Sequence, residues 1–101
     1  MALDIHRPDT DEFIFSLNDE RYNCLSVIFE WFEKPTGIYI DPYGDTILDV
    51  KCLSFLAKLI DGYVHKTDLN LDKKRTSAIL EFRGVLNIFI EKNVPLKFYG
   101  D

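Results

Sequence analysis

The chain contains one long stretch without a helical pattern, Gly37-Ile38-Tyr39-Ile40-Asp41-Pro42-Tyr43-Gly44-Asp45-Thr46-Ile47-Leu48-Asp49. Asp41, Pro42 and Gly44 occupy the first, second and fourth positions that a type I turn favours. β-favouring residues flank this turn on both sides, over residues 38–40 and 46–48. The pattern predicts a small β-hairpin over residues 38–48 whose tip is acidic, aromatic and exposed.

Three amphipathic helices are predicted around this stretch, because apolar residues recur every three to four positions. Their expected ranges are residues 19–34, 50–64 and 72–92. Asn18 or Asp19 caps the first helix, Asp49 caps the second, and Pro35 ends the first. Gly62 and Gly84 lie inside the second and third helices, where glycine is unfavourable by about 1 kcal/mol relative to alanine. We expect close backbone approach at both glycines, or an early helix end at Gly62.

The chain ends have weaker patterns. Residues 1–12 are polar and acidic, and we expect them to be loosely ordered. Residues 13–17 and 96–99 alternate in polarity as strands do, and the second of these segments is expected to pair with the hairpin or with the first. The fold class that follows is α+β and mainly helical, with three amphipathic helices, a small β-hairpin and one or two further short strands. Its length of 101 residues indicates a single domain over residues 1–101.

Charge is distributed unevenly along the chain, which has a formal net charge of −5. Residues 1–49 carry three bases against eleven acids, a net −8, whereas residues 50–101 carry nine bases against six acids, a net +3. Phosphate binding needs lysine and arginine, so the acidic half argues against direct nucleic-acid binding. It suits a basic protein partner, although many cytosolic proteins are mildly acidic for solubility alone.

The two cysteines, Cys24 and Cys52, fall among apolar residues of predicted helices. We expect both to be buried and reduced, which indicates a reducing compartment. The first twelve residues lack the apolar core of a signal peptide, and charged residues interrupt every long apolar run. These features predict a cytoplasmic protein that does not interact with membranes.

No motif for catalysis, cofactor binding or metal binding is present in the sequence. His6 and His65 have no cysteine, serine or carboxylate at a motif spacing, and no glycine-rich phosphate loop occurs. Asp41, Asp45 and Asp49 repeat every four residues, which is the wrong interval for a calcium loop. Lys73-Lys74-Arg75 lacks interleaved aromatic residues and is interpreted as a solvated face. We therefore expect a protein without enzymatic activity, with no catalytic residues, cofactor or metal.

Small size, acidity, cytosolic character and abundant aromatic residues give this chain an overall resemblance to bacterial immunity proteins of contact-dependent growth-inhibition and other polymorphic toxin systems. The segment closest to a signature is Ile38 to Thr46, in the predicted hairpin. The resemblance implies a stoichiometric inhibitor that binds a cognate toxin domain, commonly a basic nuclease, and blocks its active site or substrate groove. The alternative is a small cytosolic regulatory or adaptor module whose partner is not a toxin.

The predicted partner-binding surface centres on the hairpin tip and the start of the second helix. An exposed tyrosine ringed by carboxylates is typical of an interface anchor with a charged rim. Trp31 lies off the main apolar stripe of the first helix, so it is either a second packing contact or a further anchor. The predicted binding residues are Tyr39, Asp41, Tyr43, Asp45 and Asp49, followed by Glu30, Trp31 and Glu33.

Overall fold

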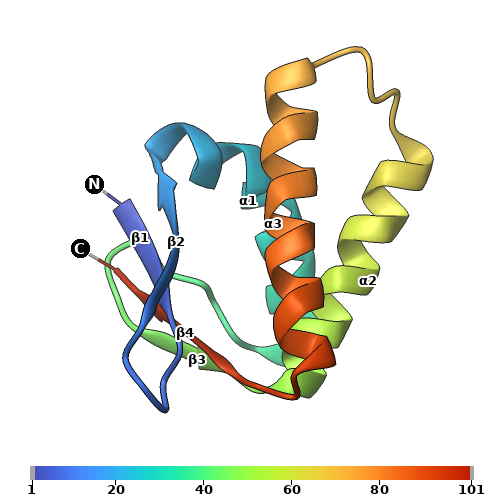
Figure 1. The fold of residues 1–101 in the computed structure, drawn as a ribbon. Coiled ribbons are helices and arrows are strands. Elements are labelled where there is room, and N and C mark those ends of the chain that lie inside the picture. Colours follow the sequence, from blue (N-terminus) through green and yellow to red (C-terminus); the bar gives the residue numbers. More distant parts are fainter. Residues whose placement is uncertain (1, 101) are drawn as a thin grey trace.

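The structure is a computed structural model that describes residues 2–100, and it has two layers (Figure 1). Three helices lie against one face of a four-stranded antiparallel sheet, so the predicted α+β, mainly helical class is confirmed. The elements follow in the order β1 (Ala2–His6), β2 (Phe13–Asn18), α1 (Asp19–Thr36), β3 (Thr46–Leu48), α2 (Val50–Lys66), α3 (Lys73–Glu91) and β4 (Leu96–Tyr99). Within residues 2–100, no helix combines the length and apolar composition needed to cross a membrane.

The two chain ends form the centre of the sheet, whose strand order is β2-β1-β4-β3. The prediction that residues 1–12 are loosely ordered is therefore wrong for the described part of that segment. β1 pairs with β2 on one side and with β4 on the other, and Leu3 and Ile5 are fully buried. Leu3 and Ile5 face the core, and Asp4 and His6 alternate with them toward the other face of the sheet.

The predicted hairpin over residues 38–48 is also corrected. Its turn is present, since the Gly44 amide donates to the Asp41 carbonyl at 3.2 Å, but its arms do not pair. The second arm, β3, pairs with β4, while the first arm stays irregular. Ile40 explains the difference, because its side chain is buried in the core and its carbonyl accepts a hydrogen bond from the Tyr22 hydroxyl at 2.7 Å. The hairpin of this fold is instead β1–β2.

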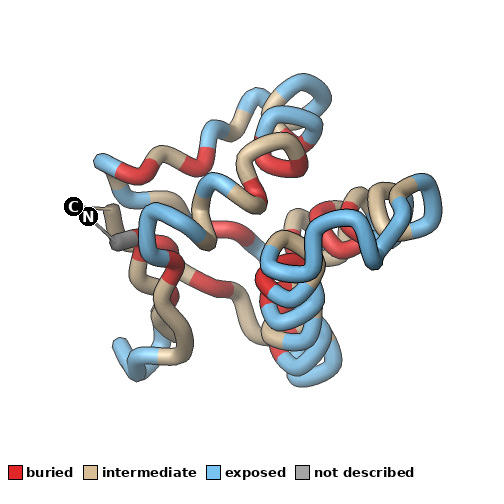
Figure 2. The backbone as a smooth tube through the Cα atoms, turned by 90° about the horizontal axis from the view of Figure 1, so that it is seen from above, coloured by how far each residue is buried: buried red, intermediate tan, exposed pale blue. Residues whose placement is uncertain are grey.

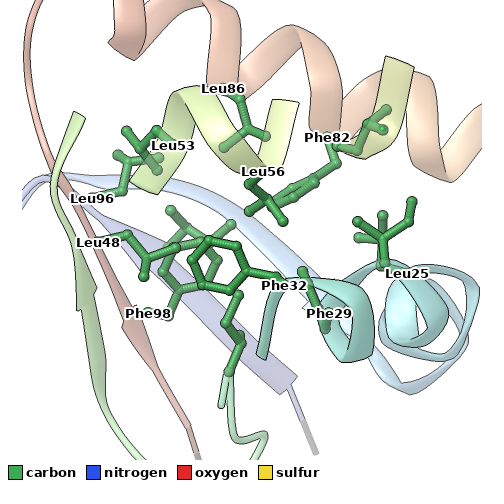
Figure 3. Packing of buried hydrophobic residues seen from close by; sticks show 14 of the residues in the cluster. Leu25, Phe29, Phe32, Leu48, Leu53, Leu56, Phe82, Leu86, Leu96 and Phe98 are labelled. Atoms are coloured by element: carbon green, nitrogen blue, oxygen red, sulfur yellow. The ribbon is translucent and has the colours of Figure 1, made fainter. Parts of the chain in front are cut away.

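The core lies between the helices and the inner face of the sheet (Figure 3). Phe29 and Phe32 from α1, Phe82 from α3 and Phe98 from β4 are its largest fully buried side chains. Figure 2 shows the same division along the backbone, with buried positions facing inward and exposed ones on the outer sides of the helices. The apolar stripes of all three predicted helices supply this core, as the sequence pattern indicates.

Caps set the helix boundaries. The side chains of Asn18, Asp49 and Asp72 accept hydrogen bonds from the first turns of α1, α2 and α3. Pro35 does not end α1, which continues to Thr36 and stops at Gly37 with a φ of 72°. α2 continues past Gly62 to Lys66, so the expected early end is wrong.

Two expectations about packing are also wrong. A Cβ atom built at Gly62 or at Gly84 would have no neighbour within 4 Å, so no close backbone approach explains either glycine. Cys24 and Cys52 are free, but both are only partly buried. Each lies at the margin of an apolar helix face, where the helical period exposes one side of a small residue.

Candidate functional site: an acidic strip on the α1–β3 connection

The connection from α1 to β3 is held at fixed points although it has no regular structure. Ile40 and Pro42 are buried, and the Asp41 carboxylate accepts a hydrogen bond from the Tyr43 amide at 2.8 Å. The Gly100 amide, just after β4, donates to the Gly44 carbonyl at 2.9 Å. The turn at residues 41–44 is thus fixed to the core on one side and to the end of the sheet on the other.

Between these points the connection presents aromatic and acidic side chains to solvent. Tyr43 is 71% exposed, and Tyr39 and Asp45 are exposed as well. Burial raises the pKa of the Tyr22 hydroxyl above its usual value, and the neighbouring Tyr39 side chain and the negative charges of Asp41 and Glu30 raise it further. The Tyr22 hydroxyl donates to the Ile40 carbonyl and so ties the connection to α1.

We name this surface the acidic strip and define it as Glu30, Tyr39, Asp41, Tyr43 and Asp45. Of the other predicted residues, Glu33 lies one helical turn after Glu30. Asp49 lies at the opposite end of β3 from Asp45 and caps α2 by accepting from the Cys52 amide at 2.8 Å. That hydrogen bond lowers the pKa of the Asp49 carboxyl and keeps it ionised.

Trp31 lies apart from the acidic strip. It is exposed at its edge, but its ring packs on Tyr63 of α2 with centroids 5.9 Å apart. The sequence left Trp31 as either a second packing contact or a binding anchor, and the structure shows the packing contact.

Ion pairs with lysine or arginine compensate five of the sixteen acids in residues 2–100, and six acids outside the predicted surface also lack such a pair. In the described residues, Asp9, Glu20, Asp61, Asp72 and Glu81 each lie within 4 Å of a lysine or arginine nitrogen. None of Glu30, Glu33, Asp41, Asp45 or Asp49 has such a partner among residues 2–100. Lys34 is the only base between Arg21 and Lys51 in the sequence. Negative charge is thus left uncompensated at the predicted surface.

A hollow of about 510 Å³ lies between the first turns of α1 and α3, but four of its five charged side chains pair with one another. Arg21 pairs with Glu81 at 3.3 Å, and Lys74 pairs with Glu20 at 3.7 Å. Burial raises the pKa of the Cys24 thiol, which also lines the hollow. A protonated thiol is a poor nucleophile, so this hollow has no activated group.

A polar cluster on the outer face of the sheet was not predicted from the sequence. His6 Nδ1 lies 3.0 Å from the Asp11 carbonyl oxygen, and the Tyr99 hydroxyl donates to Asp11 Oδ1 at 3.1 Å. Asp11 has a positive φ of 58°, which asparagine and aspartate tolerate better than most residues. The cluster ties the β1–β2 turn to β4, and the alternation of residues 2–6 was the signal that could have located it.

The described residues offer little else for chemistry. No group of three histidine, cysteine, aspartate or glutamate side chains in residues 2–100 is placed to hold a metal ion. No family model matches this chain, and no curated protein or solved structure is significantly similar to it. Function is therefore argued from the acidic strip itself.

Proposed function

We propose that this chain is an immunity-type inhibitor that binds a cognate toxin domain, in the cytoplasm, through the acidic strip. The single observation that supports this proposal is the set of unpaired carboxylates around two exposed tyrosines. Five of the eleven other acids in residues 2–100 are neutralised by a lysine or arginine within 4 Å, whereas none of the five acids from Glu30 to Asp49 is. An uncompensated acidic surface with aromatic anchors is suited to a basic protein partner.

A basic nuclease domain is the partner class that we favour. Its substrate groove must be lined by lysine and arginine to bind phosphates. Carboxylates of Glu30, Asp41 and Asp45 would stand in for those phosphates and compete for the same groove. Complementary charge also speeds association, which matters for an inhibitor that must act before the toxin does.

Rigidity of the turn at residues 41–44 supports the same proposal. Buried Pro42, the Asp41 side-chain hydrogen bond and the Gly100 contact fix the turn before any partner arrives. A surface that is already ordered loses less conformational entropy on binding. A larger part of the favourable contact energy therefore remains in the net binding free energy. Tyr43 at this turn has the two-torsion, amphipathic side chain that binding anchors favour.

Co-purification from the source cell tests the proposal. The wild-type chain should retain a basic protein encoded beside it, and co-expression should protect cells from that protein's toxicity. Asp45→Lys should lose both effects. Glu12→Lys makes the same change in net charge at an exposed carboxylate outside the acidic strip, and it should retain both.

Three outcomes would overturn the proposal. A retained partner that is not toxic would favour the regulatory or adaptor alternative. Equal loss in Glu12→Lys and Asp45→Lys would show that net charge alone drives capture. A salt-sensitive shift of DNA or RNA by the isolated protein at micromolar concentration would show direct nucleic-acid binding, which this account excludes.

A further inference from the structure

The outer face of α3 combines two exposed apolar side chains with an unexplained glycine. Leu80 is 47% exposed and Ile88 is 48% exposed, and Gly84 lies midway between them. Residues four apart share one helix face, so the three form a line about 12 Å long. Glycine inside a helix is unfavourable by about 1 kcal/mol relative to alanine, and no atom within 4 Å of its virtual Cβ requires it here.

Charges at the two ends of α3 oppose its own dipole. The first turn carries Lys73, Lys74 and Arg75 after a single acid, the N-cap Asp72, and the last turn carries Glu91 before a single base, the C-cap Lys92. A helix is stabilised by the reverse arrangement, which α1 has, with Asp19 and Glu20 in its first turn and Lys34 in its last. Two properties of α3, its glycine and the excess of positive charge in its first turn, are therefore unfavourable within a single copy.

We propose that a second copy of this chain packs its α3 antiparallel against this face, with the twofold axis passing at Gly84. Such an interface uses the same patch twice, so each contact occurs in reciprocal pairs. Leu80 is four residues before Gly84 and Ile88 is four after, so Leu80 meets the partner's Ile88 and Ile88 meets the partner's Leu80. The absence of a side chain at Gly84 lets the two backbones approach closely at the crossing point, as small residues do at helix crossings.

The antiparallel arrangement also brings the positive first turn of one α3 near the C-terminal end of the other. The partner's Lys73 and Lys74 come to lie within about a turn of Glu91 and of the last carbonyls of α3. Glu91 and Lys73 have no ion-pair partner of their own among the described residues. This charge complementarity is why we assign the face to a second copy rather than to an unrelated protein.

A contact made by one helix per copy is small for a specific interface, so the dimer is expected to be weak. Interfaces below about 1,200 Å² are typical of transient encounters, and we expect a dissociation constant of about 10 to 100 µM. No residue of the acidic strip lies on α3. The failure of either proposal is therefore distinguishable from the failure of the other.

Sedimentation velocity from about 1 µM to 1 mM protein tests the dimer. The mass of the wild-type chain should rise from 11.8 kDa toward twice that value. Leu80→Glu should raise the dissociation constant at least tenfold. Leu71→Glu makes the same change at an 82% exposed leucine off this face and should leave association unchanged.

A cysteine cross-link tests the position of the axis. Under mild oxidation Gly84→Cys should form a disulfide-linked dimer much faster than Gly62→Cys, because only position 84 meets itself across the axis. A chain that stays monomeric up to about 1 mM overturns the proposal. So does equal weakening by Leu80→Glu and Leu71→Glu, or equal cross-linking at the two glycine positions.

Discussion

Two regions of the molecule contrast with each other: the connection from Gly37 to Asp49, and helix α3. The connection lacks regular structure, yet buried side chains and hydrogen bonds fix it at several points while its carboxylates stay unpaired. Helix α3 is regular, yet its glycine and the positive charge of its first turn are unfavourable. The difference teaches that regular secondary structure and a fixed conformation are separate properties, because tertiary contacts fix the connection, whereas α3 stays helical despite unfavourable residues.

The largest expected effect tests whether buried anchors fix the connection. Ile40→Ala should lower the free energy of unfolding by about 2 to 5 kcal/mol, because it removes a fully buried side chain and leaves a cavity. Ile47→Ala is the matched control, since Ile47 is exposed and the change should stay within about 0.5 kcal/mol. Urea denaturation measures both. Similar losses for the two variants would show that Ile40 is not the anchor.

The next effect concerns binding rather than stability. Tyr43→Ala should weaken binding to the captured partner by about 2 kcal/mol or more, because a large exposed aromatic anchor is lost. Its unfolding free energy should change little, since Tyr43 makes no buried contact. Phe13→Ala removes an exposed aromatic from the outer face of the sheet and should bind normally by calorimetry. Normal binding by Tyr43→Ala would place the interface elsewhere.

Three glycines differ in whether the fold requires the absence of a side chain at their position. Gly62→Ala and Gly84→Ala should each raise the unfolding free energy of the monomer, by up to about 1 kcal/mol, because alanine is the better helix former. Gly100→Ala should lower it, because its Cβ would overlap the backbone of Tyr43 and Gly44. Thermal denaturation at low protein concentration ranks the three. Destabilisation by Gly84→Ala would reveal an intramolecular role for that glycine.

The smallest effect is the pH dependence of the α2 cap. The pKa of the Asp49 carboxyl is lowered in the folded protein, so ionised Asp49 stabilises the fold at neutral pH. That contribution should disappear as pH falls from about 4, the unfolded value, through the lower folded pKa. Asp49→Asn keeps a side-chain acceptor, and its stability should fall less over that range. Identical acid profiles for the two proteins would contradict this role.

The sequence predicts the helices well because their apolar stripes are long and their caps are local. Asn18, Asp49 and Asp72 accept hydrogen bonds from amides three residues ahead, so nothing distant is needed to specify them. Strand pairing is different, because β1 and β4 meet from opposite ends of the chain. Short strands with two inward residues each do not encode their partner, and the tight turn at residues 41–44 therefore suggested the wrong pairing.

The candidate site was predictable only where it depends on local sequence. Tyr43 and Asp45 follow from the turn chemistry, which is local, and both are exposed as expected. That Glu30 acts on the same hydroxyl as Asp41 depends on how α1 packs beside the connection, which no local pattern contains. Trp31 was grouped with these acids by sequence proximity, although the helical period directs it toward Tyr63.

The most direct test of the acidic strip is a nuclear magnetic resonance titration of the isotope-labelled protein with its captured partner. We predict that amide signals of residues 39–45, together with Glu30, shift or broaden first. Signals of α3 and of the outer sheet face should remain in place at the same partner ratio. Changes concentrated on α3 or around Phe13 and Ile47, with residues 39–45 unaffected, would contradict the account.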